Sequence, residues 1–227
     1  MPYEKYLNDK FVAFLKGEGL TNPLVELTTL QVETPLENNV KNYTISLTNS
    51  NSTAKRKNEF RLKESEHFCV IGFAVLLGRY AADGSTQEIP QTYPNPALFT
   101  TPAERYSLSS VYNGRLQFTT TNLKLSPEFD MFNNYFNAGV ASPVTDPAGP
   151  IQPVIGAENN ERGFVSIVNP ILLSGDIAQN VVINLGSGSA ANLEPASGEN
   201  VLIVKPYGFH YMGMTQSQEK GECRVLS

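Results

Sequence analysis

Residues 68–77 read Phe68-Cys69-Val70-Ile71-Gly72-Phe73-Ala74-Val75-Leu76-Leu77, a run without a single charged side chain. The run is much shorter than the roughly 20 residues that a transmembrane helix needs. A short, continuously apolar run is typical of a strand that is buried on both faces or that lies at a subunit contact. Residues 68–77 therefore predict such a β-strand.

Around this strand, shorter segments alternate apolar and polar residues, which is the period of a half-buried strand. The alternating segments are 43–48, 60–63 and 116–119. Further strands are expected at 24–33, 106–112, 163–168, 170–174, 180–185 and 200–211. Asn113-Gly114 accepts the positive φ angles of a type I′ turn, so residues 106–112 and 115–121 are expected to pair as a hairpin.

Two helices are predicted, both at the periphery of the strand pattern. Between Pro2 and Lys16, apolar residues recur at steps of three and four, and Gly17 follows as a helix end. This amphipathic helix is expected to lie on its own domain, on a neighbouring subunit or on a membrane surface. A second helix is expected at 127–137, because Ser126 is a good N-cap and Pro127 suits the first turn.

Two long loops are rich in proline. They cover residues 89–102 and 142–153, and each contains four prolines. Proline confines φ and so lowers the entropy lost on ordering, which favours fixed, extended excursions that contact something.

The strand pattern predicts the fold class. About nine or ten strands with two peripheral helices favour an all-β fold, an antiparallel sandwich or barrel. Wide and uneven strand spacing favours a jelly roll over an up-and-down barrel. The expected organisation is an N-terminal helix in residues 1–20 and a jelly-roll body in residues 21–227.

Composition and charge exclude several functions. Charged residues are 17% of the chain and the net charge is −5, so there is no general attraction to nucleic acid. The basic cluster Lys55-Arg56-Lys57 is interpreted as a solvated loop. The two cysteines, Cys69 and Cys223, lie in very different contexts and are interpreted as free thiols.

The residues for catalysis are scarce. The chain has two histidines and no G-x-S-x-G motif, and Gly186-Ser187-Gly188-Ser189 lacks the lysine and the following helix of a phosphate-binding loop. His67 and Cys69 share one strand face, but a zinc site would need further ligands such as His210 and Cys223. We therefore expect no catalytic residue, no cofactor, no metal and no enzymatic activity.

Together these features resemble a known family. The features are the N-terminal helix, the apolar strand at 70–77, the proline loop Tyr93-Pro94-Asn95-Pro96, the Tyr112-Asn113-Gly114 turn, and the runs 169–175 and 180–185. This layout is similar to that of the jelly-roll major capsid protein of tailless, membrane-containing icosahedral bacteriophages.

The resemblance implies a function. It implies a capsid shell subunit that self-assembles as a homotrimer within a larger shell, beside other capsid proteins. It also implies an N-terminal helix directed toward an internal membrane, no direct contact with nucleic acid, and a place in the virion after synthesis in the host cytoplasm.

The chain departs from that family in one respect. The phage lineage commonly has two jelly rolls per chain, which need about 16 strands. The residues after the helix are too few for that number of ordinary strands and loops, so the sequence favours one barrel. If there are two, they are expected at 21–125 and 138–227, divided by the helix 127–137.

For a shell protein, the functional residues are contacts. The expected interface residues lie in the N-terminal helix and in the first proline loop: Tyr3, Leu7, Phe11, Phe14, Tyr93, Pro94, Pro96 and Phe99. Three alternatives remain open from the sequence: a carbohydrate- or receptor-binding β-sandwich, a minor or penton capsid protein, and a hydrolase that uses carboxylates. Because the chain has no tryptophan, it lacks the usual platform for sugars.

Overall fold

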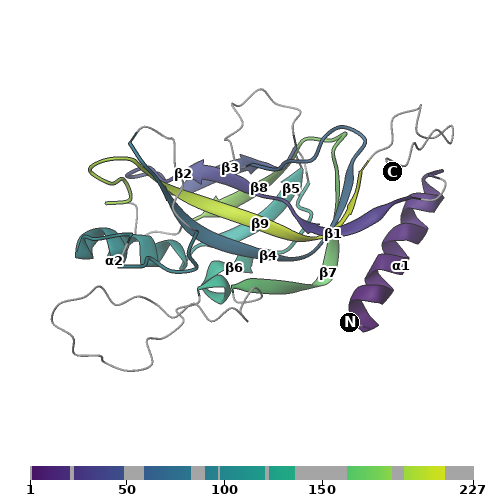
Figure 1. Cartoon of the computed structure of the whole chain (residues 1–227), viewed down its shortest axis with the longest axis horizontal. Helices are drawn as coiled ribbons and strands as arrows, with labels where there is room; N and C mark the ends of the chain where they lie inside the picture. Colours follow the sequence, from purple (N-terminus) through teal and green to yellow (C-terminus); the bar gives the residue numbers. More distant parts are fainter. Residues whose placement is uncertain are drawn as a thin grey trace, which may run out of the picture.

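A computed structural model describes most of the chain. The described residues are 2–20, 23–48, 59–82, 90–96, 98–120, 123–135, 163–185 and 192–212. They form two antiparallel sheets that pack face to face, with one helix at each end of the long axis (Figure 1). The all-β fold class expected from the strand pattern is confirmed.

Nine strands make up the two sheets. The first sheet contains β1 (Val25–Thr29), β2 (Val32–Pro35), β4 (His67–Tyr80), β7 (Phe164–Ser174) and β9 (Glu199–Tyr211). Its order is β1-β9-β4-β7, and β2 pairs with the other end of β9. The second sheet contains β3 (Asn42–Ser46), β5 (Arg115–Thr120), β6 (Phe129–Asp130) and β8 (Gln179–Asn184), in the order β3-β8-β5-β6.

Strand β4 is the apolar run from which the prediction started. It pairs with β9 on one side and with β7 on the other, so it is internal to the first sheet. Phe68, Val70 and Phe73 point into the core between the sheets, whereas Cys69 and Ile71 belong to a second cluster on the outer face. The prediction of a strand buried on both faces is confirmed.

Helix α1 (Pro2–Gly17) covers one end of that outer face. Leu7, Phe11 and Leu15 recur at steps of four, and they are buried against side chains of β4 and β9. The chain leaves the helix through Gly19, whose φ of 89° suits glycine at this position. The predicted N-terminal amphipathic helix is therefore confirmed.

Helix α2 (Pro102–Val111) lies where a strand was predicted. The Thr101 side chain accepts a hydrogen bond from the Glu104 backbone N–H, and Pro102 occupies the first turn, so the segment has a strong helix start. Asn113 and Gly114 follow the helix end. The predicted hairpin of 106–112 with 115–121 is wrong, and β5 pairs with β6 and β8 instead.

The predicted helix at 127–137 is also wrong. Residues 127 and 128 are in no regular element, Phe129–Asp130 form the short strand β6, and a single 3₁₀ turn, η1 (Met131–Asn134), follows. The Ser126 hydroxyl accepts from the Phe118 backbone N–H at 3.0 Å and is therefore used by β5. Asp130 caps η1 by accepting from the Phe132 N–H at 2.9 Å. Residues 136–137 lie outside the described part of the chain.

Three strand predictions differ from the structure in detail. Segment 24–33 is divided between β1 and β2, and the break lies where the Leu30 N–H donates to the Pro206 carbonyl at 2.9 Å. Segments 163–168 and 170–174 form one strand, β7, and Pro170 is tolerated there because β7 is an edge strand. Segment 60–63 makes only isolated bridges, at Phe60 and at Leu62.

Early and late strands of the chain interleave in both sheets. β9 lies between β1 and β4, and β8 lies between β3 and β5. The division into 21–125 and 138–227 therefore does not separate the described strands into two barrels.

Candidate functional site

The four predicted contact residues in the N-terminal helix have different environments. Leu7 and Phe11 are only 7% and 3% exposed, because they pack on their own sheet. Phe14 is 38% exposed, and the side chain of Tyr3 lies outside the described part. Only Phe14 of the described three can therefore reach a partner without detaching the helix.

The first proline loop is fixed to its own chain. Pro94 and Phe99 are buried, Tyr93 is half-buried, and only Pro96 of the four predicted contacts is exposed. The Arg79 guanidinium donates to the Leu98 carbonyl at 3.0 Å and holds the loop against β4. The described residues of the loop therefore mainly contact their own sandwich. The second proline loop, 142–153, lies outside the described residues.

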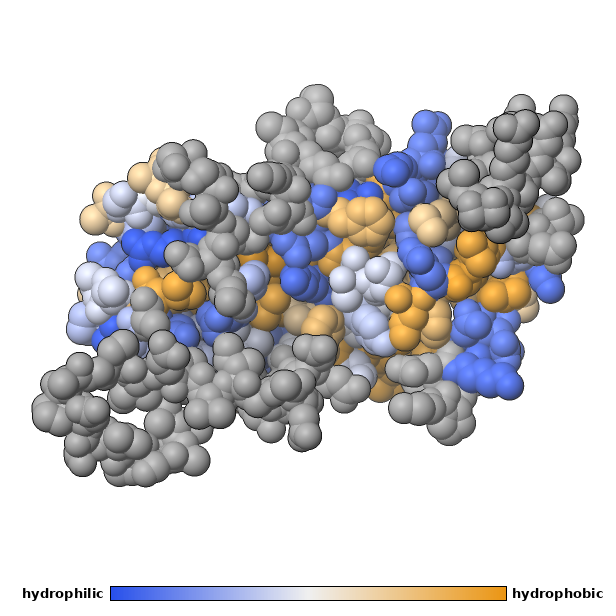
Figure 2. Space-filling view, in the orientation of Figure 1, coloured by the Kyte–Doolittle hydropathy of each residue, from blue (hydrophilic) through white to orange (hydrophobic). Residues whose placement is uncertain are grey.

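An exposed apolar surface lies at the end of the molecule that carries α1. We call it the α1–β1 patch, and it consists of Tyr6, Phe14, Leu24 and Leu27, which are between 38% and 62% exposed. Figure 2 shows apolar surface among hydrophilic side chains at this end. Clustered exposed apolar residues of this kind are typical of interaction surfaces.

The sequence pattern missed most of this patch. Tyr6 and Phe14 are eight residues apart on α1, and the buried stripe consists of Leu7, Phe11 and Leu15. A helical period of 3.6 places Phe14 on the flank of the buried face and Tyr6 on the open side of the helix, so the spacing carried a usable signal for their exposure. Leu24 and Leu27 carried none, since a strand residue has the same sequence signature whether its face is covered or open.

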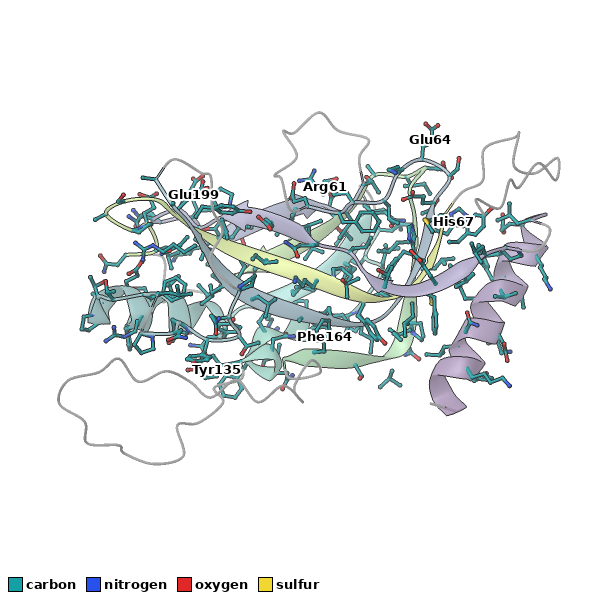
Figure 3. The ribbon with its side chains drawn as sticks, viewed as in Figure 1. Arg61, Glu64, His67, Tyr135, Phe164 and Glu199 are labelled. Atoms are coloured by element: carbon teal, nitrogen blue, oxygen red, sulfur yellow. The ribbon has the colours of Figure 1, made fainter. Side chains whose placement is uncertain are left out.

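The two histidines point to opposite faces of the first sheet. His210 is fully buried, and its ring nitrogens lie 3.7 Å from Glu26 Oε1 and 3.4 Å from Glu66 Oε2. His67 faces the side that carries α1, with its ring 6.4 Å from that of Phe14 (Figure 3).

The side chains that a zinc site would need lie on different faces of the first sheet. His67 and Cys69 lie on the outer face and His210 on the inner face, so these three do not converge. In the part of the chain that the structure describes, no three or more His, Cys, Asp or Glu side chains form a group that could hold a metal ion. Cys223 lies outside that part.

Other buried polar groups are bound to one another. Glu33 accepts hydrogen bonds from the Tyr80 hydroxyl and the Gln31 amide, each at 2.6 Å. Arg61 donates to both carboxylate oxygens of Glu59, at 2.8 and 3.0 Å. Burial lowers the pKa of the neighbouring Lys205, and the charge of Glu33 opposes that shift. These contacts connect β2 to the strands and segments beside it.

Cys69 is not an activated nucleophile. It lies beneath α1, and desolvation by burial raises the pKa of its thiol to about 11. The thiolate is the reactive form of cysteine, so this environment suppresses reactivity near neutral pH.

Comparison with known proteins gives no relative: no protein-family model, curated protein or solved structure matches the chain. No helix in the described ranges is long and apolar enough to cross a membrane. The α1–β1 patch, with its exposed apolar side chains, is the candidate site for contacts with other molecules.

Proposed function

We propose that the chain is a jelly-roll capsid shell subunit of a tailless, membrane-containing icosahedral bacteriophage. The observation that carries the proposal is the order of the strands in the two sheets. β1 and β2 pair with successive parts of β9, with Thr29 opposite Tyr207 and Val32 opposite Val204, so they count as one broken strand. With β1 and β2 counted together as strand 1, β3 to β9 become strands 2 to 8. The first sheet then has the order 1-8-3-6, and the second sheet has the order 2-7-4-5.

These orders follow from wrapping one antiparallel ribbon around a barrel. If strands 1–4 run along one side of a ribbon and strands 8–5 return along the other, the ribbon pairs are 1 with 8, 2 with 7, 3 with 6 and 4 with 5. Wrapping the ribbon brings 8 beside 3 and 7 beside 4. These orders agree with those of an eight-stranded jelly roll, the fold used by many viral capsid proteins and also by lectins and cupins, and so they support the proposal.

The α1–β1 patch favours a shell subunit among these jelly-roll proteins. β1 is an edge strand of the first sheet, and it carries Leu27 at 46% exposure, with Leu24 just before it at 62%. Apolar side chains on an exposed edge invite packing by another chain. We assign this edge to contacts with other copies in a homotrimer and with other capsid proteins.

The outward side of α1 suits a membrane surface. It combines Tyr6 and Phe14 with exposed lysines at positions 5, 10 and 16. Aromatic and basic residues on one helix favour the interface of an anionic membrane. A shell separated from its genome by lipid needs no basic arm, which agrees with the net charge of −5. The proposed location is the virion, after synthesis in the host cytoplasm.

The test of assembly uses the purified chain, light scattering after size exclusion, and electron microscopy. We expect trimers or larger regular particles from the wild type and monomers from Leu27→Asp, with melting temperatures unchanged. Ile177→Asp is the matched control, because Ile177 is 53% exposed in the turn between β7 and β8. A wild-type chain that stays monomeric, with a melting temperature raised by a sugar, would favour a binding module instead.

The membrane contact has its own test. We expect the wild type to float with vesicles that contain anionic lipid, and Phe14→Ser to float much less. The control is Leu123→Ser, since Leu123 is 68% exposed between β5 and β6. Equal flotation of both variants would contradict a role for α1 at the membrane.

A further inference from the structure

A shallow depression lies between α2 and η1, at the opposite end of the sandwich from α1 (Figure 1). Its volume is about 330 Å³, within the range of small-molecule pockets. The lining residues are Tyr106, Ser109, Ser110, Asn113, Phe132 and Tyr135. The first four are spaced i, i+3, i+4 and i+7 along the chain, so α2 and the turn after it present them on one face.

Aromatic rings form the apolar part of the depression. The rings of Phe132 and Tyr135 are parallel within 3°, with centroids 6.3 Å apart. Tyr106 is 81% exposed and Phe132 is 60% exposed, so both offer ring surface to a ligand.

The ring of Tyr135 packs against the hydrophobic core. The ring of Tyr112 packs edge-on against Tyr135 at 5.2 Å, and Tyr112 itself is 1% exposed. The Tyr112 hydroxyl donates to the Val75 carbonyl of β4 at 3.3 Å. Figure 3 shows Tyr135 beside η1, below the end of α2. Because Tyr135 is held by Tyr112, and Phe132 is stacked on Tyr135, a ligand would lose little affinity in ordering these two rings.

Polar groups surround the rings. The side chains of Tyr106, Ser109, Asn113 and Tyr135 have no hydrogen-bond partner among the described residues. The Ser110 hydroxyl donates to the Ser107 carbonyl and retains acceptor capacity. Hydroxyls and an amide supply both donors and acceptors around one aromatic surface.

The depression is uncharged. None of its six lining residues is ionic. The neighbouring charges on α2 are directed elsewhere, because Arg105 donates to the Phe99 and Thr100 carbonyls and Glu104 pairs with Arg79. Among the described lining residues, a phosphate, a carboxylate or a nucleic acid would find no counter-charge.

We propose that the α2–η1 depression binds a neutral saccharide. The apolar C–H face of a sugar ring stacks on Phe132 and Tyr106, and its hydroxyls exchange hydrogen bonds with Ser109, Asn113 and Tyr135. Ring stacking with satisfied hydroxyls is the recognition that this combination of residues offers. The proposal goes beyond shell assembly and does not depend on it.

The test is saturation-transfer difference NMR on the full chain with the methyl glycosides of glucose, galactose, mannose and N-acetylglucosamine, and with their disaccharides. We expect at least one sugar to give a saturable signal. We expect Tyr106→Ala and Phe132→Ala to weaken its affinity by about tenfold, the loss of one stacking contact. Phe132→Tyr should retain binding, because it preserves the ring.

Tyr6→Ala is the matched control, since Tyr6 is an exposed tyrosine of α1, at the other end of the molecule. Its sugar affinity and the melting temperatures of all variants should equal those of the wild type. The proposal is overturned if no sugar gives a signal, or if Tyr106→Ala and Phe132→Ala bind as tightly as Tyr6→Ala. Binding of adenosine or of a tyrosine-containing peptide without any sugar would overturn it as well.

Discussion

Glu104 connects helix α2 to the end of the first sheet. Its side chain pairs with Arg79 of β4 at 3.3 Å and accepts from the Asn200 amide of β9 at 2.8 Å. The residue is 6% exposed, so its charge is stabilised mainly by these contacts. Removing a buried carboxylate leaves its hydrogen-bond donors without an acceptor. The resulting loss of stability is larger than the net contribution of the hydrogen bonds, because the donors stay buried and unsatisfied.

Glu104→Ala is therefore expected to lower the free energy of unfolding by about 2–3 kcal/mol. Urea unfolding followed by circular dichroism measures the effect. The matched control is Glu128→Ala, which removes an ion pair with Arg115 whose side chains are 47% and 69% exposed. An exposed pair contributes about 0–1 kcal/mol. Equal losses of unfolding free energy in both variants would show that the buried Glu104 contacts stabilise the fold no more than an exposed ion pair does.

A second residue-scale test uses two glycines. A Cβ added to Gly175 would lie 1.6 Å from the Lys63 carbonyl oxygen, whereas one added to Gly17 meets no atom within 4 Å. We expect Gly175→Ala to destabilise the fold by about 1–3 kcal/mol, the usual effect of overpacking. Gly17→Ala should be neutral or stabilising by up to about 1 kcal/mol. Thermal unfolding of the two variants side by side checks the difference.

At the residue scale, the sequence contained a helix signal that the strand interpretation of 106–112 overlooked. Thr101, Pro102 and Glu104 form a cap, a first-turn proline and a capping-box partner. Once α2 is recognised, Tyr106, Ser109 and Asn113 fall on one face, so that half of the depression was predictable. Phe132 and Tyr135 were not, because their approach to α2 depends on tertiary packing.

At the scale of elements, α1 acts as a cover for the outer face of the first sheet. Phe11 and Leu15 are 3% and 0% exposed, and they pack in the same cluster as Cys69. An expectation from the sequence alone is that deleting residues 1–17 leaves a folded body. The burial of this stripe argues that the deletion also uncovers apolar surface and lowers stability.

The cover can be tested through the thiol beneath it. In a Cys223→Ser background, Cys69 is the single thiol, and we expect iodoacetamide to label it slowly at pH 8. Phe11→Ala should speed labelling at least tenfold and cost about 3–5 kcal/mol of stability. Phe14→Ala is the control on the same helix, and since Phe14 is 38% exposed it should change both quantities little. Equal labelling rates would mean that α1 does not protect the thiol.

The pH dependence of the same reaction follows from the raised pKa. The thiolate reacts, so the rate is half-maximal when the thiol is half ionised, and it levels off only when ionisation is nearly complete. Burial raises the pKa of Cys69 from 9.0 to about 11. We expect the labelling rate of the urea-unfolded Cys223→Ser chain to be half-maximal near pH 9, and that of the native chain to reach half of its maximum only near pH 11. A native rate that is half-maximal near pH 9 would contradict the burial.

The strands were more predictable than the turns between them. Alternation or continuous apolarity marked β3, β4, β5, β8 and β9, because burial of a sheet face imposes that pattern directly. The prediction of a helix at 127–137 was wrong for a different reason. Ser126 and Asp130 are both good caps, and only the tertiary pairing of Phe118 with Ser126 decides which one begins a helical turn.

At the scale of the whole molecule, the strand order places the first and the last of the described strands in the same sheet. β9, which comes last among the described strands, is enclosed by β1 and β2 on one side and by β4 on the other. Most pairings therefore join residues far apart in sequence, a topology that folds slowly and as a unit. No local pattern encodes such pairings, so the sequence indicated how many strands to expect but not which strands pair.

This interleaving predicts one cooperative unfolding transition for the intact chain. Fragments 1–125 and 138–227 should each lack regular structure, because the first contains β4 without β9 and the second contains β9 without β4. Calorimetry of the whole chain and proton–nitrogen NMR of each fragment measure this. Mixing the fragments should restore dispersed spectra, since together they hold every described strand except the two-residue β6. Two separate transitions, or a folded fragment on its own, would instead indicate two independent barrels and would remove the strand order as support for a single jelly roll.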